Sequence, residues 1–299
     1  MYVGHHTIIV NDIEVGITNP DKMLWPSITK AEYLTYLSTI APLMLPGLHN
    51  KPLTVIRFPD GVDGEAFYQR NCPDYAPDYI QTVQYEDHNQ IVCSDLQTLL
   101  WLGNQAAIEF HVPFSTYDTE KPSEIVFDLD PPSKHDFHLA IKAAQQIKTI
   151  LDQLQLIGFI KLSGNKGIQI HIPLPYKTYS YDQTKRFTRF IANYLTEVDP
   201  DSFTTERLKE KRKGRLYIDY VQHAAGKTII APFSARGNTE GLIAAPIEWD
   251  ELTSTLTPKD YTMKDVSKRT INPFSEFDVV RHKQPFKPIL DWLTTNKTE

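Results

Sequence analysis

The spacing of apolar residues predicts a chain of short strands and amphipathic helices. Apolar residues at alternate positions indicate strands, and apolar residues three or four positions apart indicate helices. The predicted strands are 52–58, 109–113, 123–130, 215–221 and 227–234, with hairpins over 7–15 and 159–174. The predicted helices are 30–45, 95–108, 136–156 and 182–195, with one or two short helices after residue 261. Because strands pair both locally and across helices, we expect an α+β (mixed α/β) fold with a mixed sheet.

Three helices carry more specific expectations. Pro42 lies late in the helix at 30–45 and is expected to bend or end it, because proline has no backbone N–H to donate. Asp95 is expected to cap the next helix through its side-chain oxygen. Residues 136–156 carry the longest helical pattern of the chain.

The strand at 123–130 ends in two acidic residues. Asp128 and Asp130 are two positions apart, so both point to one face of the strand, while Ile125, Phe127 and Leu129 point to the other. Like charges on one face repel each other, but a divalent cation such as Mg²⁺ or Mn²⁺ would cancel the repulsion. Pro131 and Pro132 follow directly and place the pair at the rim of the sheet. A solvated acidic pair is the alternative.

A third carboxylate strengthens the metal interpretation. Asp219 ends the apolar run Arg-Leu-Tyr-Ile-Asp and shares a strand face with Tyr217 and Arg215. Three carboxylates from two strands are the ligands that a two-metal site for phosphoryl transfer requires.

Two further segments could bind an anion. The turn Ser-Gly-Asn-Lys-Gly at 163–167 is expected to expose backbone N–H groups, with Ser163, Lys166 and, further on, His171 as donors. A plain surface turn with a core histidine is the alternative. In the segment 231–236, Ser234 and Arg236 are expected to lie at a strand end and to point the same way.

Composition indicates an ordinary globular protein. The chain has 299 residues, of which 41% are hydrophobic and 23% charged. No apolar run reaches the roughly 20 residues that span a bilayer, and we expect no signal peptide and no contact with membranes. Cys72 and Cys93 form no C-x-x-C pattern, so we expect no zinc, no disulfide framework and a cytoplasmic location.

The charge is distributed unevenly along the chain. The formal net charge is −6, but residues 161–236 hold 14 basic and 7 acidic side chains, a net of +7. Local fields steer polyanions more than the total charge does, so this basic segment allows a nucleic-acid partner. A solvated basic surface is the alternative.

Several of these motifs together resemble a known family. Asp-Leu-Asp-Pro-Pro, Ser-Gly-Asn-Lys-Gly-Ile-Gln-Ile-His and the segments around Ile218–Gln222 and Lys227–Arg236 resemble the polymerase domain of bacterial ligase D. That family belongs to the archaeo-eukaryotic primase superfamily and acts in non-homologous end joining. The resemblance extends over nearly the whole chain. It implies one catalytic domain over 1–299 with a largely antiparallel sheet, in which 1–115 carries DNA contacts and packs on a catalytic core at 116–299.

The resemblance also implies roles for individual residues. Asp128, Asp130 and Asp219 match the catalytic, metal-binding carboxylates. The matches to the nucleotide site are Ser163, Lys166, His171, Arg212, Gln222, Ser234 and Arg236. Phe67 and Tyr68 match aromatic residues that stack on template bases, although core packing is the alternative for such a pair. Asn19, Lys22 and Lys30 match a pocket for a DNA 5′-phosphate, although the loop between them is shorter here, and His111 matches a recurrent histidine.

The implied activity is template-dependent nucleotide addition to DNA 3′ ends, with two Mn²⁺ or Mg²⁺ ions and a preference for ribonucleotides. The implied partners are DNA with 5′-phosphorylated ends or gaps, NTP or dNTP, a Ku-like protein and a DNA ligase. Three alternatives stay open: a stand-alone primase, a DNA-end binding or bridging module without catalysis, and a metal-dependent glycosyltransferase. No K-x-D-G ligase motif is found.

Overall fold

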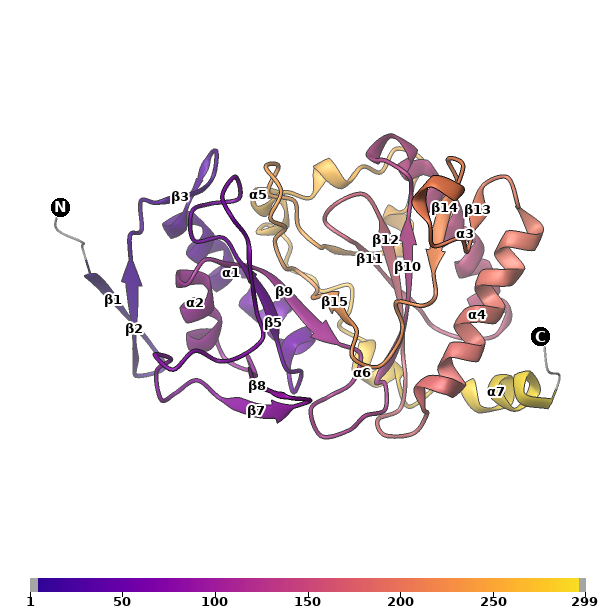
Figure 1. Cartoon of the computed structure of the whole chain (residues 1–299), viewed down its shortest axis with the longest axis horizontal. Coiled ribbons are helices and arrows are strands. Elements are labelled where there is room, and N and C mark those ends of the chain that lie inside the picture. The colour runs from indigo at the N-terminus through magenta and orange to yellow at the C-terminus, as the bar shows by residue number, and fades with distance from the viewer. Residues whose placement is uncertain (1–4, 296–299) are drawn as a thin grey trace. The chain divides into compact units, whose positions relative to one another are not determined.

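The structure is a computed structural model that describes residues 5–295 (Figure 1). Contacts between Cα atoms divide the chain into two compact units, which we call the first and the second unit. The first unit runs to Pro113 and also takes residues 228–244 and 259–270; the second comprises 114–227, 245–258 and the remainder from Ile271. The single domain, with its parts 1–115 and 116–299, stays a prediction.

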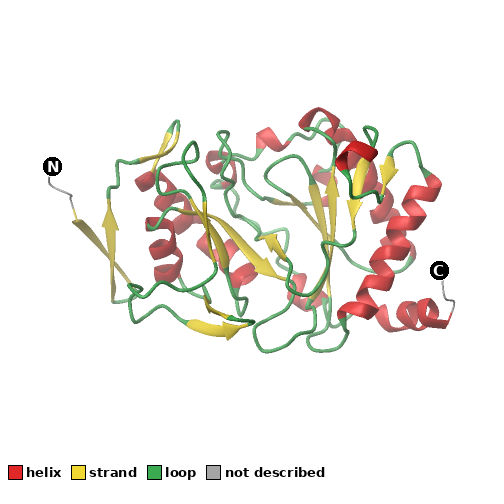
Figure 2. Ribbon diagram, viewed as in Figure 1, coloured by secondary structure: helices red, strands yellow, loops and turns green. Residues whose placement is uncertain are grey.

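The second unit contains a six-stranded sheet and most of the long helices (Figure 2). Its strands are β10 (Glu124–Asp130), β11 (Phe159–Leu162), β12 (Ile168–Pro173), β13 (Phe203–Thr204), β14 (Leu216–Asp219) and β16 (Pro246–Ile247). Its helices are α3 (Phe137–Gln153), α4 (Tyr181–Val198), α6 (Phe277–Val280) and α7 (Phe286–Thr295). The order is β13-β14-β10-β12-β11-β16, and every pair except β13 with β14 is antiparallel.

The two faces of this sheet differ in chemistry. Ile125, Phe127 and Leu129 of β10 have no exposed surface, and the Phe127 ring packs edge-on against Phe187 of α4. Burial of such side chains stabilises each by about 1.5–3 kcal/mol and holds the helices on this face. The opposite face of β10 carries Asp128 and Asp130.

The first unit is built on a four-stranded sheet of order β15-β9-β5-β6, with three separate two-stranded hairpins. Its strands are β1 (His5–Val10), β2 (Ile13–Thr18), β3 (Met23–Trp25), β4 (Ile28–Thr29), β5 (Thr54–Arg57), β6 (Phe67–Gln69), β7 (Thr82–Tyr85), β8 (His88–Ile91), β9 (Ala107–Pro113) and β15 (Thr228–Ile230). Its helices are α1 (Lys30–Leu48), α2 (Leu96–Asn104) and the short α5 (Met263–Val266). Buried Tyr33 of α1 donates its hydroxyl to the Ala107 carbonyl at 2.7 Å.

Helix α1 differs from the sequence prediction. It continues through Pro42 and Pro46 to Leu48, so Pro42 does not end the helix, and a bend at Pro42 stays a prediction. Proline inside a helix costs about 3 kcal/mol, but Ile40, Ala41 and Met44 around it are buried, and that burial offsets the cost. At 19 residues α1 is also longer than α3, which has 17.

Two other predicted boundaries need correction. The Asp95 cap is confirmed, with its carboxylate accepting from the Thr98 N–H at 2.8 Å. The helix that it caps ends at Asn104 rather than 108, because Ala107 and Ile108 belong to β9. Asp219 ends β14, so the strand predicted to reach residue 221 stops two residues earlier.

Candidate active site

Four polar residues form one row across the sheet of the second unit. The register places Asp219 of β14 opposite Asp128 of β10, Asp128 opposite Gln169 of β12, and Gln169 opposite Lys161 of β11. Residues directly opposite each other in antiparallel strands point to the same face. The row therefore lies on the face that α4 does not cover.

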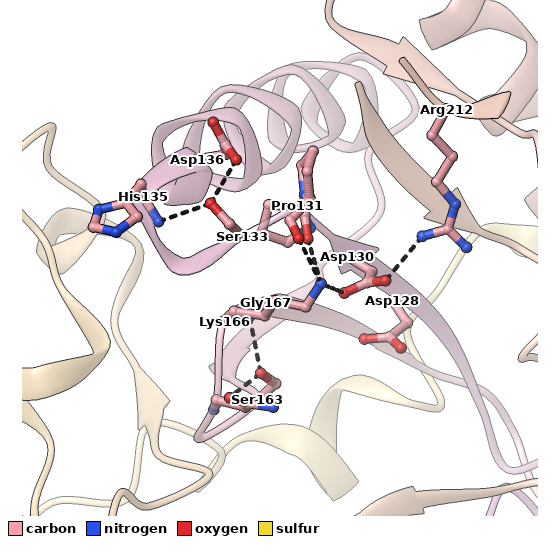
Figure 3. Close-up of polar contacts among 12 residues, drawn as sticks. Asp128, Asp130, Pro131, Ser133, His135, Asp136, Ser163, Lys166, Gly167 and Arg212 are labelled. Carbon is pink, nitrogen blue, oxygen red and sulfur yellow. Dashed lines mark hydrogen bonds and ion pairs between the residues drawn. The ribbon is translucent and has the colours of Figure 1, made fainter. Parts of the chain in front are cut away.

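Asp130 lies on the same face as Asp128 and is held by two cations. Lys166 Nζ is 2.9 Å from one carboxylate oxygen of Asp130, and Arg212 Nη1 is 3.1 Å from the other. Lys166 also donates to the Pro131 carbonyl at 2.6 Å, and the Arg212 guanidinium stacks over the Tyr217 ring. Figure 3 shows the two cations approaching Asp130 from opposite sides, with Asp128 beside it.

Asp128 has a raised pKa in the folded protein. Burial raises the pKa of Asp128 to about 6. A hydrogen bond from Gln169, whose Nε2 lies 3.1 Å from Asp128 Oδ1, opposes this rise and lowers the pKa. The negative charges of Asp219 and Asp130 raise this pKa further, and the positive charge of Lys161 lowers it. A cation at this face would favour the charged form of the carboxylate.

Asp219 is tied into the turn that follows its strand. Its Oδ1 accepts hydrogen bonds from the Tyr217 hydroxyl at 3.1 Å and from the backbone N–H groups of Val221 and Gln222 at 3.1 and 2.9 Å. Burial, followed by the charge and hydrogen bond of Asp219, raises the pKa of Tyr217 above its usual value. Asp219 therefore also fixes the backbone of Gln222.

The three carboxylates fit a divalent cation by donor type, and they share one face of the sheet. Their oxygens are ligands that Mg²⁺ and Mn²⁺ prefer, and the strand register puts all three on one face. Within residues 5–295, however, no group of three or more His, Cys, Asp or Glu side chains is arranged so that it could hold a metal ion. Lys166 and Arg212 hold Asp130, and donors of the turn hold Asp219, so the metal ligands stay a prediction.

The turn between β11 and β12 is shaped by Ser163 and two glycines. Gly164 has a positive φ of 70°, and a Cβ at Gly167 would lie 2.5 Å from the Leu129 carbonyl oxygen. Ser163 Oγ accepts from the Gly167 N–H at 3.0 Å and from the Asn165 N–H at 3.3 Å. Two N–H groups of the expected anion cradle are thus engaged within the turn, and Lys166 remains beside Asp130.

His171 is not brought to this turn. It is 2% exposed, its Nδ1 lies 2.8 Å from Glu124 Oε2, and its ring packs against Phe274. This geometry is that of the core histidine we considered as the alternative. Gln169 occupies the position beside Asp128 instead.

Sequence reasoning missed both Gln169 and Lys161. Strand alternation already placed Gln169 on the face of His171 and two residues nearer the turn. Lys161 stood out as a single charge within the apolar run Phe-Ile-Lys-Leu. The missing information was the register between strands.

Ser234 and Arg236 belong to the first unit and follow β15, which ends at Ile230, so the expectation of a strand end is wrong. Ser234 is fully buried, and its Oγ accepts from the Phe110 N–H at 2.9 Å. Arg236 lies 3.3 Å from Glu109, whose carboxylate also contacts His111 Nε2 at 2.9 Å. Burial would raise the pKa of Glu109, but the His111 hydrogen bond, the Arg236 charge and a backbone N–H lower it below its usual value.

Phe67 and Tyr68 are both exposed, with 49% and 77% of their surface accessible. They lie on β6, the last strand of the four-stranded sheet, and point to opposite faces of it. The alternative that the pair packs in the core is therefore wrong. Their stacking on template bases stays a prediction.

The residues expected to bind a 5′-phosphate are adjacent but differ in burial. The Lys30 N–H donates to the Lys22 carbonyl at 2.8 Å, which ties the loop after Asn19 to the start of α1. Lys30 is 5% exposed, and its Nζ donates to the carbonyls of Thr18 and Asn104 at 2.8 and 3.1 Å. Burial and then the charges of Lys22 and Arg57 lower the pKa of Lys30 to about 8.

Lys22 is the more accessible of the two lysines and lies 3.0 Å from Asp60. Asn19 adopts a positive φ of 49° at the start of the loop. The phosphate pocket stays a prediction. No helix in the described part of the chain is both long and apolar enough to cross a bilayer.

Comparison with known proteins identifies the fold and the family. The chain matches the solved polymerase domain of Mycobacterium tuberculosis ligase D in complex with DNA, with a TM-score of 0.82 and 28% identity over 91% of this chain and 99% of that one. The mixed α/β fold is therefore that of an archaeo-eukaryotic primase-like polymerase domain. Residues 29–273 match the family model of the LigD primase-polymerase domain, and the chain belongs to this family.

Curated relatives agree with this assignment. The bifunctional non-homologous end joining protein LigD of Bacillus subtilis (strain 168) is 46% identical over 94% of this chain and 47% of its own length. The multifunctional non-homologous end joining protein LigD of Mycolicibacterium smegmatis is 33% identical over 80% of this chain and 32% of its own length. The chain thus spans about half or less of these relatives. The resemblance seen in the sequence motifs is confirmed.

Proposed function

We propose that the chain is a template-dependent nucleotidyltransferase that adds ribonucleotides or deoxyribonucleotides to DNA 3′ ends at gaps and breaks during non-homologous end joining. The observation that carries the proposal is the acidic face of the second unit. On that face Asp219 lies directly opposite Asp128, and Asp130 points to the same side. The chain that carries these residues belongs to the LigD primase-polymerase family.

In the proposed reaction the oxygen of a primer 3′-hydroxyl attacks the α-phosphorus of the nucleotide. The hydroxyl proton is lost, the bond between the α- and β-phosphates breaks, and pyrophosphate leaves. Asp128, Asp130 and Asp219 would hold two Mn²⁺ or Mg²⁺ ions, which when bound lower the pKa of the hydroxyl and neutralise the triphosphate. Asp130, which now contacts Lys166 and Arg212, would exchange these contacts for the cation.

Basic groups around the acidic face support a triphosphate as substrate. Lys166 and Arg212 already lie at the rim beside Asp130, where each can move to a phosphate oxygen. Ser163 holds the turn that carries Lys166, and Asp219 holds the turn that carries Gln222. Positioning and charge neutralisation then account for most of the rate.

DNA binding is part of the same proposal. The relative with the matching fold was solved in complex with DNA, and the exposed Phe67 and Tyr68 offer π-faces for template bases. Asn19 and Lys22 are proposed to bind a 5′-phosphate at the far end of a gap, and the buried Lys30 is proposed to support this pocket by tying its loop to the carbonyls of Thr18 and Asn104. A Ku-like protein and a DNA ligase are proposed as partners.

The decisive experiment is extension of a primer across a short gap with a 5′-phosphate at its far end. Ribonucleotides and deoxyribonucleotides are compared with Mn²⁺, with Mg²⁺ and with a chelator. We expect templated addition that requires the ion and is faster with ribonucleotides and Mn²⁺. Binding of the gapped duplex without any extension would contradict the proposal and favour a DNA-end bridging module, and synthesis on an unprimed strand would favour a primase.

A further inference from the structure

Lys161 is a fully buried lysine in the middle of β11, between the buried residues Ile160 and Leu162. An ammonium group in such a position is unfavourable unless it is paired and hydrogen-bonded. Its Nζ donates to Gln169 Oε1 on the neighbouring strand. The catalytic scheme above gives this lysine no role.

The lysine determines which way the amide of Gln169 faces. An ammonium group has three donors and no acceptor, so only the carbonyl oxygen of Gln169 can face it. The NH₂ group of the same amide is then directed along the row toward Asp128, where Nε2 lies 3.1 Å from Oδ1. An amide turned the other way would present its oxygen to the carboxylate and repel it.

This chain of donors constrains a rotation that the strand leaves free. The backbone of β10 fixes the direction of the Asp128 side chain, but the terminal torsion of an aspartate is broad and roughly two-fold. The hydrogen bond from Gln169 to Oδ1 selects one orientation of the Asp128 carboxylate. The opposition of all four residues in the register makes the arrangement continuous across four strands.

We propose that Lys161 and Gln169 are positioning residues that hold the Asp128 carboxylate in the orientation in which it binds a divalent cation. The proposal rests on the proposed function, because it takes Asp128 as a metal ligand. Residues that hydrogen-bond to metal ligands change metal affinity by 10- to 100-fold when they are removed.

The alternative is that Lys161 only balances the negative charges of the row. The two ideas predict opposite effects for Lys161→Met. Loss of a balancing charge tightens the binding of a cation at Asp128, whereas loss of a positioning group weakens it. The sign of the change therefore decides between them.

The experiment measures Mn²⁺ dissociation constants from the electron paramagnetic resonance signal of free Mn²⁺, without DNA or nucleotide. We expect Lys161→Met and Gln169→Met each to weaken binding about tenfold, and the double variant to be no weaker than Gln169→Met alone, because the lysine acts through the glutamine. In primer extension, kcat falls while the KM for nucleotide stays unchanged. Tighter or unchanged Mn²⁺ binding in Lys161→Met, or multiplied effects in the double variant, overturn the proposal.

Gln169→Asn keeps the amide but is one methylene shorter, so it cannot reach both Lys161 and Asp128. We expect it to lose as much affinity as Gln169→Met, and it serves as the test if Lys161→Met does not fold. The matched control is Ile170→Val, which perturbs the same buried strand outside the row and leaves Mn²⁺ affinity unchanged.

A second readout needs no metal. We expect the side-chain amide protons of Gln169 to exchange slowly with solvent in the wild-type protein and faster in Lys161→Met, measured by ¹⁵N NMR of labelled glutamine. Absence of Mn²⁺ binding by the wild type would overturn the proposed function and this proposal together. Wild-type binding that is unchanged in Gln169→Met and Gln169→Asn overturns only the positioning roles.

Discussion

The polar row of the second unit (Asp219, Asp128, Gln169 and Lys161) and the proposed DNA contacts of the first unit are built in different ways. Asp128, Gln169 and Lys161 lie on adjacent strands, and hydrogen bonds connect their side chains in sequence. Tyr68, by contrast, lies on an edge strand with most of its surface exposed, and Lys22 lies in a loop. Groups that must meet reacting atoms are fixed by the sheet, whereas groups that meet a variable strand of DNA remain accessible.

Lys30 falls between these two kinds of construction. It is assigned by resemblance to DNA binding, yet it is buried like Gln169 and Lys161, and two backbone carbonyls accept hydrogen bonds from it. The comparison therefore separates residues by what their loss should change. Loss from the row should change catalysis, loss of Lys30 should change stability, and loss of the exposed groups should change DNA affinity alone.

The largest expected effect is that of Asp128→Ala. We expect nucleotide addition to fall at least about a thousandfold, because the central carboxylate of the proposed metal site is removed, while affinity for gapped DNA stays unchanged. Single-turnover extension and fluorescence anisotropy measure the two quantities. Asp152→Ala, which removes a carboxylate exposed on α3, is the control. Near-normal extension by Asp128→Ala would show that the metal assignment is wrong.

Asp128→Asn should stabilise the metal-free protein while it abolishes activity. The pKa of Asp128 rises from 3.8 to about 6 in the folded protein, which corresponds to about 3 kcal/mol of destabilisation by the charged form. The folded state binds the proton more tightly than the unfolded state, so this destabilisation is absent below pH 3.8 and complete above about pH 6. Urea unfolding in a chelator at pH 4 and pH 7 measures it. An equal effect of the variant at both pH values would contradict the burial of this charge.

Lys30→Met should reduce the free energy of unfolding by about 2 kcal/mol, because the carbonyls of Thr18 and Asn104 lose their donor. Lys22→Met should change it by less than about 0.5 kcal/mol, because the Lys22 side chain is partly exposed and its ion-pair partner Asp60 is exposed. Preference for a 5′-phosphate over a 5′-hydroxyl end should fall in Lys22→Met. If Lys30→Met is as stable as wild type but loses that preference, the buried lysine is a ligand of DNA rather than of the backbone.

The smallest expected effect is that of Tyr68→Ala. We expect about 1 kcal/mol, or roughly fivefold, weaker binding of a gapped duplex through the loss of one stacked base, with stability unchanged. The control is Tyr194→Ala, which removes another exposed tyrosine, in the second unit, and should leave binding unchanged. Anisotropy titrations at one fixed salt concentration make the comparison, and equal affinities for both variants would remove the stacking role.

Sequence reasoning predicted local structure wherever neighbouring residues decide it. The period of two over β10 placed Asp128 and Asp130 on one face, the glycines of the turn after Ser163 indicated the hairpin, and Asp95 indicated the start of α2. It did not predict that α1 continues past Pro42 to Leu48, where the burial of α1 outweighs a local helix breaker. Local preferences are weak, and packing with remote segments overrides them.

The site divides in the same way. The sequence by itself determined that acidic residues end two strands. It also determined that Asp128 shares a face with Asp130, and Asp219 with Tyr217, because side-chain direction along a strand follows from covalent geometry. Only the tertiary structure decided that Asp219 stands opposite Asp128, that Gln169 rather than His171 lies beside it, and that Lys161 completes the row. Register between strands depends on contacts across long stretches of chain, and a shift of one residue would turn each side chain to the other face.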